Sequence, residues 1–119
     1  MRADSYIRPH RHQKKMESFQ LIDGECDVVI FNDEGLITNV VELSSDSNFY
    51  YRLDTPRYHT LLIHTPILVI FETTNGPFYP NENDFALFGP SEGTCEALQY
   101  MDELRYRVKT WKEEFPTEH

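Results

Sequence analysis

Short strand patterns that are repeatedly interrupted by turn residues most restrict what this chain can fold into. Residues 28–31 are all β-branched or aromatic and suit a pleated, buried surface, and the turn cluster of residues 32–35 follows at once. Strand patterns recur in this way along most of the chain, at residues 6–12, 20–31, 36–43, 49–53, 59–64 and 67–73. About seven strands with frequent turns predict an all-β sandwich or jelly-roll barrel.

The C-terminal region follows a different, helical pattern. Thr94 is a plausible N-cap, and Pro116 follows the end of the pattern. Because the apolar residues recur every three or four positions, we expect a helix over about 95–114 that packs on the barrel or on a neighbouring subunit. The residues expected on its apolar face are Leu98, Met101, Leu104, Val108 and Trp111.

A chain of 119 residues fits one domain with one core. We therefore expect a single domain over 1–119, with a barrel over about 6–93. Residues 67–71 are continuously apolar, which predicts a strand covered on both faces and paired with the strand at 59–64. Residues 78–92 are interrupted by proline and glycine, so we expect them to wrap the surface without regular structure.

Charge and composition exclude several classes of function. The chain has 20 acidic and 11 basic residues, a formal charge of −9, so it lacks the basic footprint of a nucleic-acid binder. It has no apolar run long enough to span a bilayer and no signal-peptide pattern. Cys26 and Cys95 are too few for a disulfide scaffold. These features predict a cytoplasmic protein that contacts neither nucleic acid nor membrane.

Most of the side chains that could bind a metal ion lie near the start of the chain. His10 and His12 are two apart, so in a strand both imidazoles point to the same face. Glu17 follows after a short polar segment, and His59 opens a later strand after a turn. Three imidazoles and one carboxylate suit a single divalent ion such as Zn, Fe, Mn or Ni, with one or two coordination positions left open. An H-x-H pair alone is often just two surface histidines, so the prediction depends on Glu17 and His59 joining the pair.

The spacing of these residues resembles the first motif of the cupin superfamily. That motif reads H-x-H, three or four residues, Glu, six residues, Gly, and here it matches His10, His12, Glu17 and Gly24 in full. The second motif, P-x-G-x-x-H, keeps only His59. The fold implied by the resemblance is a cupin jelly-roll β-barrel with one C-terminal α-helix.

The chain also looks like the WbuC-type cupin-fold metalloproteins over about residues 6–93. The similar segments are residues 6–12, 17–19, 31–35, 58–60 and Glu72 with 76–80. This resemblance implies a metal-holding barrel encoded among genes for bacterial surface polysaccharides, and its ligand pattern carries over to His10, His12, Glu17 and His59. It supplies no reaction.

Four neighbours of these ligands are candidates for contacts with a substrate. Glu72 ends an apolar strand and is a candidate catalytic base, although a structural ion pair with Arg8 or Arg11 is an equally simple explanation. Arg8 lies two residues before His10, so in a strand its side chain points to the same face as the two imidazoles. It is therefore a candidate for binding a carboxylate or phosphate. Tyr58 and Phe19 flank ligands and are expected to wall the pocket, or else to be plain core.

Three functions remain open at this point. The first is a metal-dependent isomerase or epimerase that acts on a sugar or sugar nucleotide in bacterial surface polysaccharide (O-antigen) biosynthesis. The second is an Fe(II)-dependent dioxygenase, because the same ligands hold oxygen-activating iron. The third is a non-enzymatic cupin that binds a small anion and keeps a structural metal. In each case we expect a small anionic or sugar-derived ligand and a homodimer.

Overall fold

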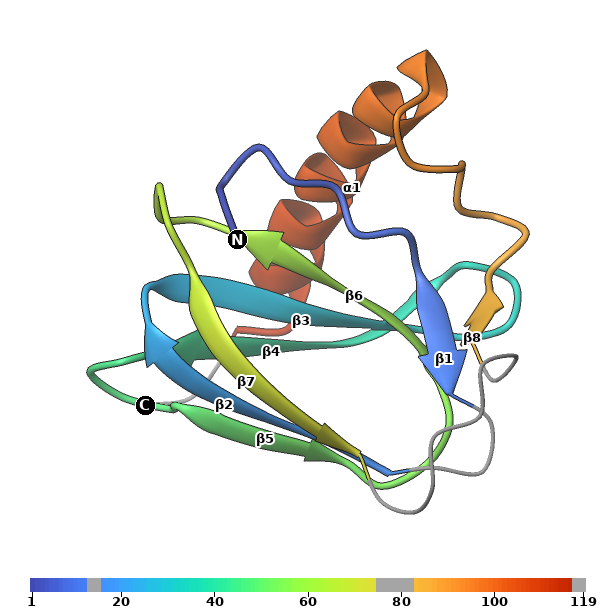
Figure 1. The fold of residues 1–119 in the computed structure, drawn as a ribbon. Helices are drawn as coiled ribbons and strands as arrows, with labels where there is room; N and C mark the ends of the chain where they lie inside the picture. Colours follow the sequence, from blue (N-terminus) through green and yellow to red (C-terminus); the bar gives the residue numbers. More distant parts are fainter. Residues whose placement is uncertain (13–15, 75–82, 117–119) are drawn as a thin grey trace.

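The computed structural model describes residues 1–12, 16–74 and 83–116, which form eight strands and one helix (Figure 1). In chain order the elements are β1 (His10–His12), β2 (Glu17–Asp23), β3 (Glu25–Phe31), β4 (Ile37–Ser44), β5 (Tyr50–Leu53), β6 (Tyr58–Ile63), β7 (Val69–Thr74), β8 (Asn83–Phe85) and α1 (Cys95–Glu114). No helix in these described ranges is both long enough and apolar enough to cross a bilayer.

The strands form two antiparallel sheets that pack face to face. The larger sheet has the order β4-β3-β6-β1-β8, and the smaller has the order β5-β2-β7. The all-β prediction is confirmed as a β-sandwich. Within the described ranges, however, no strand pair joins the two sheets, so they do not close into the predicted barrel. The core between them is apolar and contains Phe19, Leu21, Cys26, Val28, Ile30, Leu43, Leu53, Leu61, Ile63 and Leu68.

Helix α1 covers the outer face of the larger sheet, as Figure 1 shows. The predicted helix and its N-cap are confirmed, because the Thr94 side chain accepts a hydrogen bond from the Ala97 backbone N–H at 3.2 Å. One residue of the predicted apolar face is corrected. Leu98 is 61% exposed, whereas Ala97 is buried in its place. The buried face is therefore formed by Ala97, Met101, Leu104 and Val108, with Trp111 partly buried beside it.

Strand β7 differs from the prediction in its partner and in its burial. It pairs with β2 in the smaller sheet, whereas β6 pairs with β3 and β1 in the larger one. Because β7 is an edge strand with one face open, Val69 is 45% exposed and Phe71 is 61% exposed. The expectation that both faces of this run are covered is therefore wrong.

Strand β8 lies in the segment that we expected to lack regular structure. Its Asn83, Asp84 and Phe85 pair with His12, Arg11 and His10 of β1. This pairing extends the larger sheet beyond β1 and places the backbone of β8 beside the H-x-H pair.

Candidate functional site

The three predicted imidazoles gather on the inner face of the larger sheet. His10 of β1 and His59 of β6 are direct antiparallel partners, and partners of this kind project to the same face. Their ring centroids are 4.7 Å apart. His12 shares this face because it lies two residues after His10, and the centroids of these two rings are 5.7 Å apart.

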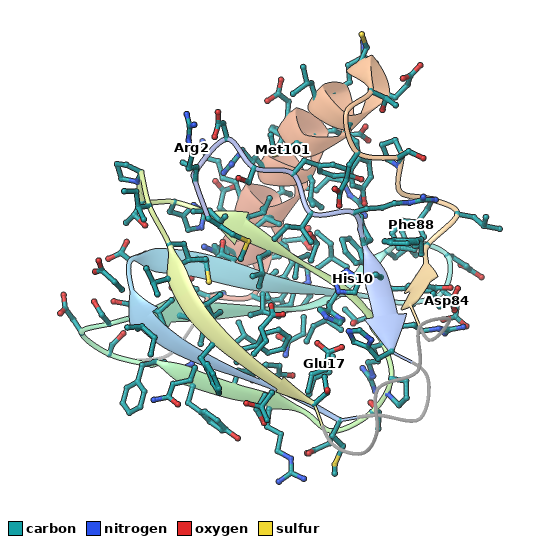
Figure 2. The ribbon with its side chains drawn as sticks, in the orientation of Figure 1. Arg2, His10, Glu17, Asp84, Phe88 and Met101 are labelled. Carbon is teal, nitrogen blue, oxygen red and sulfur yellow. The ribbon has the colours of Figure 1, made fainter. Side chains whose placement is uncertain are left out.

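The carboxylate arrives from the opposite sheet. Glu17 opens β2, and its side chain is only 4% exposed. Its Oε1 atom lies 3.2 Å from His12 Nε2, and its Oε2 atom lies 3.1 Å from His59 Nε2. Figure 2 shows His10 and Glu17 in the space between the two sheets. The structure therefore brings the four predicted residues together, and we call them the His–Glu cluster.

Backbone carbonyls fix the orientation of two of these rings. His10 Nδ1 lies 2.9 Å from the carbonyl oxygen of Arg8, and His59 Nδ1 lies 2.9 Å from that of Arg57. A carbonyl oxygen only accepts hydrogen bonds, so each Nδ1 carries a proton and donates it. The Nε2 atom of His59 then faces Glu17. This backbone support of an imidazole is the arrangement that orients histidine ligands in metal sites.

The electrostatics of the cluster favour an ion pair between the two buried partners. Burial opposes both charges, but the hydrogen bond from His59 and the nearby imidazoles lower the pKa of Glu17 below its usual range. Burial likewise opposes a charge on His59, yet the hydrogen bond and charge of Glu17 raise its pKa. Burial and the neighbouring His59 lower the pKa of His10. These shifts favour the neutral form of His10 and the charged forms of Glu17 and His59.

The donor set fits a divalent ion in its chemistry but not in its present spacing. Three imidazoles and a carboxylate are borderline-hard ligands typical of Zn, Fe, Mn or Ni. Over residues 1–12, 16–74 and 83–116, however, no group of three or more His, Cys, Asp or Glu is spaced to hold a metal ion. The Glu17 oxygens contact the imidazoles at hydrogen-bond distances, as expected when a carboxylate is shared between two rings.

Phe19 and Glu72 lie beside the cluster on the inner face of the smaller sheet. Phe19 follows Glu17 by two residues, is fully buried, and places its ring centroid 5.6 Å from that of His59. Glu72 is the β7 partner of Phe19, so both project to the same face. Its side chain is exposed, and partial desolvation followed by the charge of Glu17 raises its pKa. Glu72 therefore stands at the rim of the cluster.

Neither Arg8 nor Arg11 forms an ion pair with Glu72. The Arg8 guanidinium lies 5.0 Å from the Phe85 ring centroid and donates to Ala86 O and Ser91 Oγ. Arg11 projects away from the histidines, as expected, and its Nε donates to Asp84 Oδ2 at 2.8 Å. Arg8 is thus held at the β8 side of the site.

Tyr58 lies on the other face of β6 from His59. Its hydroxyl donates to Asp84 Oδ2 at 3.1 Å, and its ring lies under the Arg11 guanidinium at 4.4 Å. The prediction that Tyr58 walls the same pocket as the imidazoles is therefore corrected. Adjacent residues in a strand point to opposite faces, so an inward His59 requires an outward Tyr58.

Sequence reasoning missed Phe85. It is the β8 partner of His10, and the two ring centroids are 6.4 Å apart. Phe85 is 44% exposed and stands between His10 and the Arg8 guanidinium. Its only signal in the sequence was an aromatic residue in a proline-interrupted stretch, which does not indicate a strand.

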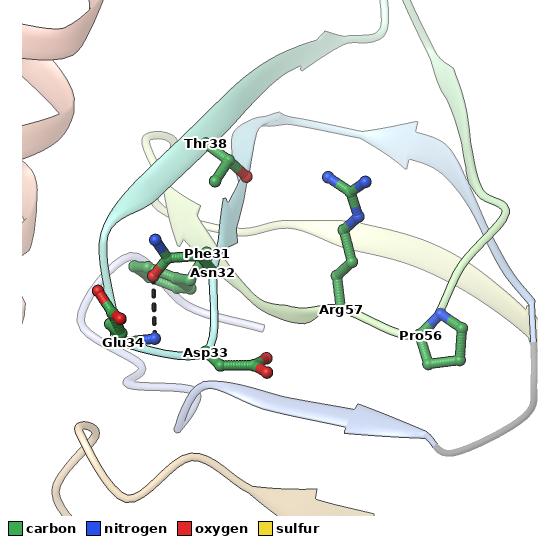
Figure 3. A pocket seen from close by; sticks show the side chains of 7 residues that line it. All are labelled: Phe31, Asn32, Asp33, Glu34, Thr38, Pro56 and Arg57. Atoms are coloured by element: carbon green, nitrogen blue, oxygen red, sulfur yellow. Dashed lines mark hydrogen bonds between the residues drawn. The ribbon is translucent and has the colours of Figure 1, made fainter.

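A surface pocket on the molecule is separate from the cluster. It lies between the β3–β4 turn and the segment before β6, and Figure 3 shows its side chains. The turn is braced by Asn32, whose Oδ1 accepts from the Glu34 backbone N–H at 2.9 Å. The pocket is lined by Phe31, Asn32, Asp33, Glu34, Thr38, Pro56 and Arg57, so it contains none of the cluster residues.

Comparisons with known proteins support the fold. A family described as a domain of unknown function (DUF6016) matches residues 1–43. No curated protein matches the chain. Among solved structures, a 3,4-ketoisomerase from Helicobacter canadensis matches with a TM-score of 0.59 and 15% sequence identity, over 86% of this chain and 69% of that one. At this identity the likeness shows that the two proteins share a fold.

Proposed function

We propose that this protein is a metal-binding cupin that acts as an isomerase or epimerase on a sugar or sugar nucleotide. The observation that carries the proposal is the His–Glu cluster, in which residues from both sheets converge on one point between them. The resemblance to the WbuC-type cupin-fold metalloproteins supports the sugar context, and the fold shared with a 3,4-ketoisomerase agrees with it. Bacterial surface polysaccharide biosynthesis is the pathway that the resemblance favours.

The arrangement suits the movement of a carbonyl group between adjacent carbons. Such an isomerisation removes a proton from the carbon next to the carbonyl and returns one to the former carbonyl carbon, without net oxidation. A divalent ion held by His10, His12, Glu17 and His59 would supply Lewis-acid polarisation of the substrate oxygens. We assign the base to Glu72, because it shares the inner face of the smaller sheet with Phe19 and because its raised pKa makes it a stronger base.

Metal analysis of protein purified without added metal or a nickel column tests the proposal. We expect about one divalent ion per chain in the unmodified protein, and its loss in His10→Ala and in His59→Ala. The matched control is His64→Ala, since His64 lies outside the cluster and contacts Asp27. Undiminished metal content in the two cluster variants would refute the ligand assignment.

A metal-free isomerase is a second candidate, because Glu17 hydrogen-bonds directly to two imidazoles. Carboxylate–imidazole pairs of this kind act as general acids and bases without a metal. If turnover of a candidate keto-sugar is unchanged after complete chelation, this mechanism replaces the metal-dependent one. If turnover is lost on chelation and returns with added ion, the metal-dependent mechanism stands.

We further propose that the protein is a cytoplasmic homodimer. The outer face of the smaller sheet exposes apolar side chains, including Tyr50, Val69 and Phe71, and its edge strands β5 and β7 are open. Oligomers of small domains are most often two-fold dimers. A sedimentation mass equal to one chain would reject the dimer.

A further inference from the structure

We propose that a second site, between β6 and the C-terminal half of α1, binds a small phosphate-bearing anion. The site is a pocket of about 450 Å³ on the outer face of the larger sheet, the face that α1 covers. It lies on the opposite face of that sheet from the His–Glu cluster. The inference is independent of the proposed function.

Three cations gather along one side of the helix. Arg105, Lys109 and Lys112 are spaced by four and three residues, so they share a helical face, and all three line the pocket. His64 faces them from the end of β6. Because the whole chain carries a formal charge of −9, a pocket with this concentration of cations is locally unusual and would attract anions.

The buried acid in the pocket already has two partners. Asp27 has a side chain that is 2% exposed, and its Oδ2 atom lies 2.8 Å from Lys112 Nζ and 2.8 Å from His64 Nε2. Lys112 Nζ also lies 3.4 Å from Glu42 Oε1, so this lysine is shared between two carboxylates, and His64 is the second partner of Asp27. A ligand in the pocket meets a compensated group and not a bare negative charge.

Arg105 and Lys109 form no ion pair with the carboxylates of the described residues. The Arg105 guanidinium is anchored through Nη2 to two backbone carbonyls, Ala3 O at 3.0 Å and Ile63 O at 3.5 Å. These contacts hold the guanidinium in place, and the two carbonyl oxygens carry no formal charge. Within the described ranges neither Arg105 nor Lys109 forms an ion pair, although Glu113 also lines the pocket from an exposed position.

These groups match the chemistry of a phosphate monoester. An anchored guanidinium presents planar donors to phosphate oxygens, while a lysine and a histidine add charge or hydrogen bonds from other directions. The buried side chains of Leu62 and Val108 line the same pocket. They offer an apolar surface to a small organic group on the phosphate.

The test is a titration of the metal-chelated full chain with inorganic phosphate and with phenyl phosphate, followed by backbone amide NMR. Sodium chloride at matched ionic strength is the reference. We expect saturable shifts at His64 and Lys109, with tighter binding of phenyl phosphate because its ring contacts the apolar side chains. Shifts that do not saturate, that chloride reproduces, or that fall only at His10 and His59 would overturn the proposal.

Variants separate binding from structural support. Lys109→Gln should weaken phosphate binding roughly tenfold, the loss expected for one charge-assisted hydrogen bond, and leave the melting temperature unchanged. Lys112→Gln should lower the melting temperature, because it leaves the buried Asp27 with one partner fewer. Arg52→Gln, an exposed cation in the other sheet, is the control and should bind phosphate normally. Equal affinity in Lys109→Gln and the unmodified chain would refute the site.

Discussion

At the scale of single residues, Gly24 illustrates how a motif position can be fixed by the backbone and not by chemistry. It links β2 to β3 with a φ of +99°, a region that side chains rarely adopt. A Cβ atom there would lie 2.7 Å from the backbone oxygen of Ile67. We therefore expect Gly24→Ala to lower the free energy of unfolding by about 2–4 kcal/mol, measured by denaturant titration.

Gly93 is the matched control for this prediction. Its φ is +79°, but an added Cβ would meet nothing within 4 Å. Gly93→Ala should therefore show only the backbone strain, roughly 1 kcal/mol. If both variants lose the same stability, the close contact at Gly24 is not the reason for glycine in the motif.

The two cysteines should differ strongly in reactivity. Cys26 is 1% exposed in the core, and burial, followed by the nearby Asp27 charge, raises the pKa of its thiol to about 12. At pH 8 only about one Cys26 in ten thousand is then a thiolate, whereas Cys95 is exposed at the first residue of α1. Iodoacetamide at pH 8 followed by peptide mass spectrometry should label Cys95 alone. Comparable labelling of Cys26 in the folded protein would contradict its buried position.

Residue spacing predicted part of the site and could not predict the rest. Alternation along a strand places His10 and His12 on one face, and it also requires Tyr58 to point away from His59. Its position next to His59 in sequence suggests that Tyr58 walls the same pocket, but adjacent residues in a strand point to opposite faces. The carbonyls that orient His10 and His59 depend on backbone positions that no residue type reveals.

At the scale of elements, the structure distinguishes two leucines of α1 that the helical pattern had treated alike. Leu104 is 1% exposed and packs against the larger sheet, whereas Leu98 is 61% exposed. We expect Leu104→Ala to cost about 2–4 kcal/mol through lost burial and a residual cavity. Leu98→Ala should change stability by less than about 0.5 kcal/mol. Thermal and denaturant unfolding of both variants checks this, and a similar loss in each would mean that the helix packs in another rotation.

The helix could be predicted more fully than the sheets because its signals are local. A cap, an apolar spacing and a terminal proline all lie within the segment itself, and they located Cys95–Glu114. Strand partners depend on the rest of the chain. The apolar residues of β7 predicted a strand but not its position at the edge of a sheet. Residues 83–85 form β8 because they pair with the edge of β1.

At the scale of the whole molecule, the His–Glu cluster connects two sheets that share no strand pairing in the described ranges. His10, His12 and His59 belong to the larger sheet and Glu17 to the smaller one. A ligand that binds all four at once would hold the sheets together at this position. Binding of this kind stabilises the folded state because the unfolded chain lacks the assembled site.

We therefore expect chelation to lower the melting temperature of the unmodified protein. An ion present at 100 times its dissociation constant contributes about 2.7 kcal/mol, or roughly 10 °C for a domain of this size. In His59→Ala, which removes a ligand buried to 2% exposure, chelation should have no effect on melting. Calorimetry of both proteins, with the ion added back, makes the comparison. If the unmodified protein melts at the same temperature with and without the ion, the hydrogen bonds of Glu17 alone connect the sheets here, and the metal-free mechanism is favoured.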